Sequence, residues 1–239
     1  MSALFISDLH LTEERPAANE QFIDFLEGRA RRAGALYILG DFFEYWIGDD
    51  DLEEPFNAVM AGLLRGLTRG GVALYLMHGN RDFLIGERFC AATGAELLAD
   101  PTVHEIEGVK TLLAHGDTLC TDDADYQNWR SIARSAQWQR EFLAKTRAER
   151  RSMILGLREK SKTVIQAKPA EIMDVNEAAV AQALREHGVT RLVHGHTHRP
   201  GRHALTVDGR PAERWVLPDW YGPGGYLEAG RGTPKLVRF

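Results

Sequence analysis

The sequence contains few cysteines, no long apolar run and no excess of positive charge, and each absence excludes a class of protein. Cys90 and Cys120 allow at most one disulfide bond, which excludes a disulfide-stapled domain and favours a reducing compartment. No apolar run reaches the roughly 18 residues that span a bilayer. Residues 1–10 lack the basic stretch and apolar core of a signal peptide. The net charge of −5 gives no general attraction to nucleic acid, so we expect a cytoplasmic protein without a nucleic-acid partner.

Short apolar runs that end abruptly in polar, metal-competent clusters recur along the chain. Such runs, bounded by turn residues, are typical of buried strands. The runs lie at 4–6, 36–39, 72–77, 111–114 and 191–193. The polar clusters that follow them lie at 7–10, 40–41, 78–80, 115–117 and 194–198.

Helical patterns lie between the early runs. Apolar residues recur at helical spacing at Phe22, Phe25 and Leu26, and again from Phe56 to Leu67. Alternation of strands and helices favours parallel pairing, and ligands gather at the carboxyl ends of parallel strands. We therefore expect the five polar clusters to converge on one site in a protein of the α/β class.

The pattern changes after Gly201. Short apolar runs separated by turns, at 203–207, 214–217, 225–228 and 235–239, predict antiparallel strands in a second sheet packed on the first. The segment from about residue 121 to 175 has long helical stretches instead, and from Trp129 to Lys168 it carries eleven Lys or Arg against three Glu. We interpret it as a helical cap inserted in a single domain that spans 1–239.

Seven residues of the polar clusters have side chains suited to divalent metal ions. Asp8 and His10 are two residues apart and can reach one ion from a strand end, and His196 and His198 repeat this arrangement. Carboxylate, imidazole and amide oxygen together suit Mn²⁺, Fe²⁺ or Zn²⁺. Seven ligands predict two ions about 3.5–4 Å apart, with Asp41 as the bridge. The predicted ligands are Asp8, His10, Asp41, Asn80, His115, His196 and His198.

The charge of such a site points to phosphate chemistry. Two divalent ions outweigh the carboxylates of Asp8 and Asp41, so the site would attract phosphate and stabilise charge on a transferring phosphoryl group. Water bound there would have a pKa lowered toward neutrality and would become the nucleophile. The sequence therefore predicts a hydrolase of phosphate esters or anhydrides.

Other candidate residues have plainer interpretations. A single histidine after a strand is more often a packing or surface residue than a ligand, so the prediction rests on the whole series. Asp82 and Asp117 are expected either to orient ligands or to act as turn or capping residues. The histidines expected to be structural are His78, His104, His187, His194 and His203.

Five blocks, in order along most of the chain, resemble those of the calcineurin-like metallophosphoesterases. They are Asp8-x-His10, Gly40-Asp41, Gly79-Asn80-Arg81-Asp82, His115-Gly116-Asp117 and Gly195-His196-Thr197-His198. The resemblance implies an αββα sandwich of two sheets flanked by helices. It also implies one ion on Asp8, His10, Asp41 and His198, and a second ion on Asp41, Asn80, His115 and His196.

Three longer stretches are similar to one branch of that family, the UDP-2,3-diacylglucosamine diphosphatases of lipid A biosynthesis. They are GDFFEYWIGDD at 40–50, HGDTLCTDD at 115–123 and IMDVN at 172–176. This resemblance implies two Mn²⁺ per chain and hydrolysis of UDP-2,3-diacylglucosamine to UMP and 2,3-diacylglucosamine 1-phosphate. We predict attack of metal-activated hydroxide on the UMP-side phosphorus. The resemblance further implies a peripheral protein on the cytoplasmic face of the inner membrane, and we expect a monomer.

Arg81 stands where many metallophosphoesterases have a histidine that protonates the leaving group. Arginine cannot act as a general acid at neutral pH, but it can clamp phosphate oxygens. A leaving phosphate monoester, with a second pKa near ~6, needs no proton, so Arg81 favours a phosphoanhydride substrate. We expect Asp41, Asn80, Arg81 and His196 to be catalytic. The substrate contacts that the resemblance implies are Asn80, Arg81, Asp123, Ser161, Lys168 and His196.

Two features of the predicted cap remain open. Where the family tends to have a small polar contact the chain has Ile165, and Thr163 or Gln166 would have to replace it. Apolar residues of the cap and the facing loop either line a cleft for acyl chains or simply pack helix on helix, while the Lys and Arg of the cap could face diphosphate or anionic lipid. These apolar residues are Trp46, Trp129, Trp138, Phe142, Met153, Ile154 and Leu157.

Two other functions fit parts of the pattern. One is a phosphoesterase that acts on nucleotides, nucleic acid or phosphoprotein, but the net negative charge argues against a long polyanion. The other is a non-catalytic interaction module on the same scaffold, but all seven ligand positions carry competent side chains. The predicted partners are therefore a lipid-linked sugar nucleotide and the inner-membrane surface.

Overall fold

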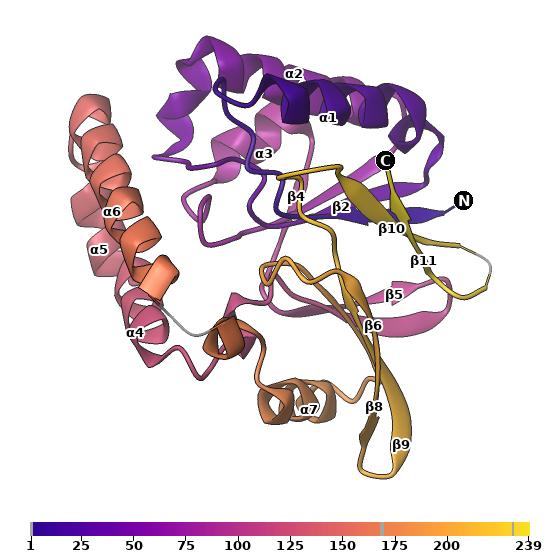
Figure 1. The fold of residues 1–239 in the computed structure, drawn as a ribbon. Coiled ribbons are helices and arrows are strands. Elements are labelled where there is room, and N and C mark those ends of the chain that lie inside the picture. Colours follow the sequence, from indigo (N-terminus) through magenta and orange to yellow (C-terminus); the bar gives the residue numbers. More distant parts are fainter. Residues whose placement is uncertain (1, 168–169, 231) are drawn as a thin grey trace.

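Two β-sheets face each other in the computed structural model, which describes residues 2–167, 170–230 and 232–239 (Figure 1). The first sheet contains β1 (Ala3–Ile6), β2 (Ala35–Leu39), β3 (Ala73–Met77), β4 (Glu96–Leu98), β10 (Gly225–Ala229) and β11 (Lys235–Arg238), in the order β11-β10-β1-β2-β3-β4. The second contains β5 (Thr102–Ile106), β6 (Val109–Leu113), β7 (Arg191–His194), β8 (Gly201–Val207) and β9 (Arg210–Val216), in the order β5-β6-β7-β9-β8. Strands β1 to β4 are parallel, as are β6, β7 and β9.

Helices cover both outer faces of this pair of sheets (Figure 1). The first sheet is covered by α1 (Pro16–Gly28), α2 (Pro55–Arg69) and α3 (Glu87–Thr93), and the second by α7 (Glu177–Glu186). The short 3₁₀ helices are η1 (Ala30–Arg32), η2 (Asp49–Glu53), η3 (Asp117–Leu119) and η4 (Ala170–Met173). The predicted α/β class and the αββα layers are thus confirmed.

Successive side chains of a strand point to opposite faces of the sheet, and this alternation separates the apolar layers. In β1, Leu4 and Ile6 pack in the cluster beneath α1 and α2, whereas Phe5 packs in the cluster between the two sheets. Proline residues mark the start of two helices. Pro16 and Pro55 occupy first-turn positions of α1 and α2, where a missing N–H costs no hydrogen bond.

Three helices form the segment that the sequence analysis interprets as a cap. They are α4 (Ala124–Ala133), α5 (Ala136–Leu143) and α6 (Arg147–Ala167), and they stand together beside the sheets (Figure 1). Asp123 and Ser135 cap α4 and α5 by accepting from the backbone N–H groups of Tyr126 and Trp138. No helix among the described residues is long and apolar enough to cross a bilayer.

The four strands predicted after Gly201 are present, but only two of them lie in the second sheet. Strands β8 and β9 pair antiparallel with each other in the second sheet, as predicted. Strand β10 pairs antiparallel with β1, and β11 with β10, so both extend the first sheet. The other strands of the second sheet are β5, β6 and β7. Apolar alternation indicates a strand and its buried face, but carries no information on which distant strand lies beside it.

Candidate active site

The five polar clusters meet at the carboxyl ends of β1, β2, β3, β6 and β7, which come from both sheets. Backbone hydrogen bonds join the clusters to one another. The N–H groups of Asp8 and His10 donate to the carbonyls of Gly40 (3.1 Å) and Asp41 (3.0 Å), and Gly195 donates to the carbonyl of His115 (2.9 Å). The predicted convergence is therefore observed, and it spans two sheets.

An unusual backbone conformation marks most of the predicted ligands. Five of them have φ between 51° and 67°, in the left-handed backbone region that residues other than glycine rarely adopt. Strain of this kind is kept only where the surroundings enforce it, and it clusters at functional sites. Here this backbone conformation, in tight turns at the strand ends, directs the ligand side chains toward one another. The five residues are Asp8, His10, Asp41, His196 and His198.

Carboxylate and imidazole atoms converge in two overlapping groups. Potential ligand atoms of Asp8, His10 and His198 lie within 4.8 Å of one another, as do those of Asp8, Asp41 and His115. His198 Nε2 is 3.5 Å from Asp8 Oδ1, and His10 Nε2 is 3.7 Å from Asp41 Oδ2. These separations are too long for strong direct hydrogen bonds and leave room for a cation between the groups.

Asn80 joins the second group through its side-chain oxygen. Asn80 Oδ1 lies 3.0 Å from His115 Nε2 and 3.0 Å from His196 Nδ1. His115 Nδ1 is 2.9 Å from the carbonyl of Leu39, to which only an N–H can donate. A neutral His115 therefore presents the Nε2 lone pair to another acceptor, Asn80 Oδ1. The two lone pairs repel each other unless a proton or a cation lies between His115 Nε2 and Asn80 Oδ1.

Buried polar atoms without partners show that the residues fit divalent ions. Asp8 Oδ1 and both ring nitrogens of His10 are buried and have no hydrogen-bond partner. Such orphan atoms are costly in a folded protein unless something coordinates them. Oxygen and imidazole donors at one place are the chemistry that Mn²⁺, Fe²⁺ and Zn²⁺ accept.

The charged groups perturb one another strongly. Burial, reinforced by the nearby carboxylates of Asp82 and Asp8, raises the pKa of Asp41 to about 7. Burial alone would lower the pKa of His115, but Asp41 and Asp117 raise it to about 9. Without a metal ion, His115 therefore favours its protonated form, whereas burial drives Asp41 toward its neutral form. Strongly perturbed pKa values in a cavity are typical of functional sites.

Two buried aspartates brace the strand-end loops. Asp82 accepts the backbone N–H groups of Phe42 (2.7 Å) and Gly79 (2.8 Å), so it ties the loop after β2 to the loop after β3. Asp117 accepts from the Tyr126 hydroxyl (2.6 Å) and from Arg130 Nε (2.8 Å), both on α4. Asp82 therefore anchors turns, which is one of the two expected roles, whereas Asp117 anchors α4, which neither expected role describes.

We call the seven predicted metal ligands the ligand cluster. The histidines that we expect to be structural lie outside it. His78 Nε2 is 2.7 Å from the carbonyl of Ile85, His104 Nδ1 is 3.3 Å from the Tyr37 hydroxyl, and His187 Nδ1 is 2.8 Å from the carbonyl of Ala183. His194 is fully buried at the end of β7. His203 lies on β8 in the second sheet. The burial of His194 agrees with a packing role, whereas His187 and His203 are exposed on the surface.

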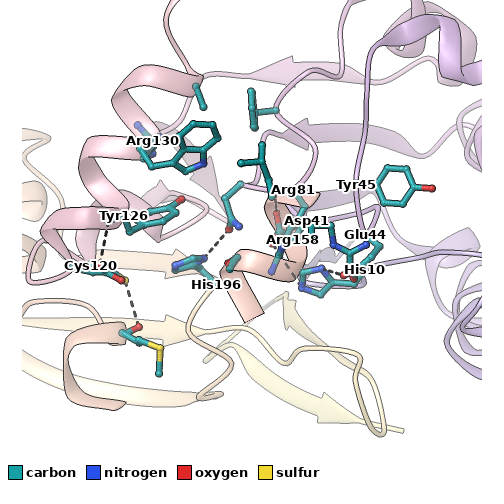
Figure 2. A pocket seen from close by; sticks show the side chains of 18 of the residues that line it. His10, Asp41, Glu44, Tyr45, Arg81, Cys120, Tyr126, Arg130, Arg158 and His196 are labelled. Carbon is teal, nitrogen blue, oxygen red and sulfur yellow. Dashed lines mark hydrogen bonds and ion pairs between the residues drawn. The ribbon is translucent and has the colours of Figure 1, made fainter. Parts of the chain in front are cut away.

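A cavity of about 550 Å³ lies between the ligand cluster and helices α4 and α6 (Figure 2). Ligand side chains on its inner wall are His10, Asp41, Asn80, His196 and His198. Five of the six predicted substrate contacts line it, namely Asn80, Arg81, Asp123, Ser161 and His196. Lys168 lies outside the described residues, as do the side chains of Thr163, Ile165 and Gln166.

The apolar wall of the cavity differs in part from the predicted cleft. The predicted residues that line it are Trp46, Trp129, Trp138, Ile154 and Leu157. Phe142 is instead buried, with its ring stacked on Trp138 at 4.8 Å, and Met153 is partly exposed to solvent. Neither belongs to the lining, so for Phe142 the packing interpretation is the correct one. Aromatic and aliphatic side chains of the cap and the main body therefore share one cavity.

Several residues of this cavity were not predicted from the sequence. Glu44, Tyr126, Arg158 and Tyr221 all line it. Glu44 belongs to the stretch at 40–50, and Arg158 is one of the eleven basic residues of the cap, but nothing in their spacing pointed to the site. Tyr221 follows the second-sheet strands and reaches the site only through the fold, with its ring stacked 4.9 Å from that of His10.

Known proteins resemble this chain over most or all of its length. The family model described as calcineurin-like phosphoesterase matches residues 1–200. A UDP-2,3-diacylglucosamine hydrolase of Aromatoleum aromaticum is 51% identical over 240 residues, which cover 100% of this chain and 98% of that protein. Proteins of the same name are 49% identical in Cellvibrio japonicus (96% of this chain, 95% of that protein) and 51% identical in Pseudomonas paraeruginosa (100% and 99%). The chain therefore belongs to the calcineurin-like phosphoesterase family.

Proposed function

We propose that this protein hydrolyses UDP-2,3-diacylglucosamine, with two Mn²⁺ ions, to UMP and 2,3-diacylglucosamine 1-phosphate in lipid A biosynthesis. One observation carries the proposal. A single cavity has converging metal-ligand side chains on one wall and aromatic and aliphatic side chains on the other. Such a cavity suits a diphosphate that bears acyl chains, because it offers charge and apolar surface side by side. The substrate named by the full-length relatives has both parts.

Each predicted ligand has a place in this proposal. Divalent ions at the site would attract the phosphate oxygens and lower the pKa of water toward neutrality. One ion would be held by Asp8, His10, Asp41 and His198, and the other by Asp41, Asn80, His115 and His196.

Arg81 and its neighbours would bind the substrate. Arg81 clamps the phosphoryl oxygens while water attacks the UMP-side phosphorus in line, and the 1-phosphate of the lipid sugar leaves. Near-equal turnover of alkyl phosphomonoesters and diphosphates would contradict this role for Arg81. The residues proposed to contact substrate are Asn80, Arg81, Asp123, Ser161, Lys168 and His196.

The proposed site of attack is tested by isotope labelling. The full-length protein is incubated with UDP-2,3-diacylglucosamine and Mn²⁺ in ¹⁸O-water, and both products are analysed by mass spectrometry. Label in UMP is expected. Label in the lipid phosphate would refute the attack site but keep the enzyme class. Asp41→Ala and His198→Ala should each abolish turnover without loss of secondary structure, and activity of either variant at saturating Mn²⁺ would contradict the ligand assignment.

We also propose that the protein is a monomer that binds the cytoplasmic face of the inner membrane through its cap. Partly exposed apolar side chains on α4, α5 and α6 accompany the basic residues of these helices, and this combination favours anionic lipid surfaces. Cosedimentation with vesicles of anionic lipid, but not with neutral vesicles, is expected. The exposed apolar residues are Trp129, Ile132, Leu143, Met153 and Leu155.

A further inference from the structure

Glu44 is a buried carboxylate between the ligand cluster and the cap, and it has no role in the mechanism above. It follows β2 and is only 8% exposed. Its two oxygens face different parts of the molecule. Oε1 accepts a hydrogen bond from Arg158 of α6, and Oε2 lies 3.3 Å from His10 Nδ1 and accepts from the Tyr221 hydroxyl at 3.5 Å. Figure 2 shows Arg158, Glu44 and His10 next to one another.

The two nitrogens of His10 face different groups. Nε2 points toward the ligand cluster, 3.7 Å from Asp41 Oδ2, whereas Nδ1 faces Glu44. A carboxylate beside one imidazole nitrogen keeps the proton there and leaves the other nitrogen free to bind a metal ion. His10 Nδ1 and Glu44 Oε2 are close, but they are not aligned as a hydrogen bond. A small rotation of the imidazole ring would align them.

Arg158 differs from the other arginines that attach α6 to the main body. Arg147 pairs with Glu53 (3.1 Å), and Arg151 pairs with Asp51 (3.0 Å), both at the acidic η2 segment away from the ligands. Arg158 pairs with Glu44 instead. A buried carboxylate is costly unless it is paired, so Arg158 helps to hold Glu44 in place beside His10.

We propose that Glu44 is a positioning residue that holds the His10 imidazole with Nε2 toward the metal site, and that its ion pair with Arg158 makes this orientation depend on the position of α6. The cap would then influence metal affinity as well as cover the cavity. The inference rests on the proposed metal site but not on the lipid substrate, so metal binding tests it independently of turnover.

The test is a titration of the metal-free, full-length protein with Mn²⁺, in which electron paramagnetic resonance measures the free ion. Glu44→Gln keeps the size of the side chain and removes its charge. We expect one of the two Mn²⁺ affinities to fall by about 10- to 100-fold, the usual cost of losing a group that orients a ligand. The other affinity should stay within about twofold. Arg147→Gln is the matched control, because it breaks an α6 ion pair away from the ligands and should leave both affinities unchanged.

The link to the cap is tested by combining substitutions. Arg158→Gln should weaken the same Mn²⁺ site as Glu44→Gln, and the double variant should be no weaker than Glu44→Gln alone, since both changes act through one contact. Additive losses would overturn the link between α6 and His10. Glu44→Asp, which keeps the charge on a shorter side chain, should retain more affinity than Glu44→Gln and serves as the readout if the latter does not fold.

Two failures can be told apart. Wild-type affinities in both Glu44→Gln and Glu44→Asp would overturn the positioning role while leaving the metal site intact. A wild-type protein that binds no Mn²⁺ would overturn the metal site itself and this inference with it. Thermal unfolding of each metal-free variant reports whether the substitution has damaged the fold instead.

Discussion

Gly79 lies so close to Asp41 that its position accepts no side chain. A Cβ atom added there would overlap Asp41 Oδ1 and the Asp41 backbone nitrogen. Gly79→Ala must therefore push Asp41 away from the site, and we expect turnover and Mn²⁺ affinity to fall by about 100-fold or more, at the upper end of the cost of misplacing a metal ligand. Steady-state kinetics and the Mn²⁺ titration measure both.

Gly62 offers the matched control for this substitution. It lies within α2, and a Cβ atom there would have nothing within 4 Å. Gly62→Ala should leave activity unchanged and stabilise the protein by about 0.4–1 kcal/mol, because alanine favours helix. A fully active Gly79→Ala protein would contradict the close packing of the two strand-end loops.

At this scale, the sequence predicts the residues whose role depends on local position. Each predicted ligand follows an apolar run, so its place at a strand end can be inferred without the fold. Glu44 and Tyr221 could not be found in this way. Glu44 contacts a helix more than 100 residues away, and Tyr221 stacks on His10 only in the folded chain. Pairing between distant segments has no local signal.

At the scale of elements, α6 is attached to the main body by arginines, and Arg150 is the most buried of them. Arg150 is 3% exposed, donates to the carbonyl of Ile47 (2.6 Å) and pairs with Asp50. Arg150→Met should destabilise the protein by about 1–3 kcal/mol, because the buried carbonyl loses its donor. Urea unfolding measures the change.

A surface pair of the same chemistry is the control for Arg150. Arg185 pairs with Asp208 at 2.9 Å, but both side chains are more than half exposed. Arg185→Met should cost less than about 1 kcal/mol, as exposed ion pairs usually do. Equal losses in the two variants would contradict a buried attachment of α6.

Many strands and helices, and the parallel pairing of the early strands, were predictable from the sequence, but the partners of the last two strands were not. The short apolar runs after Gly201 identified the last four strands, yet β10 pairs with β1, and β11 with β10, in the first sheet. Strand order depends on which apolar faces complete each layer, and that is decided by packing across the whole chain.

At the scale of the whole molecule, the cap shares its apolar core with the main body. Phe142 of α5 is buried in the same cluster as Phe43 and Trp46, and Trp138 and Ile154 pack against that cluster. We propose that residues 1–239 form a single domain in which 121–175 is an inserted cap. Unfolding should then occur in one transition, with tryptophan fluorescence and far-ultraviolet circular dichroism giving coincident curves. An earlier separate transition in fluorescence would show that the cap unfolds on its own.

Metal binding should stabilise the whole molecule, because the ligands come from five strand ends of two sheets and can meet only in the folded chain. An ion that binds only the folded state contributes about 2.7 kcal/mol at 100 times its Kd. For a chain of this size that raises Tm by about 5–11 °C per site. Scanning calorimetry of the metal-free protein with and without Mn²⁺ measures the shift. Asp41→Asn keeps the shape of the proposed bridge but loses its charge, so most of the shift should disappear. An equal shift in Asp41→Asn would place the stabilising ions elsewhere on the molecule.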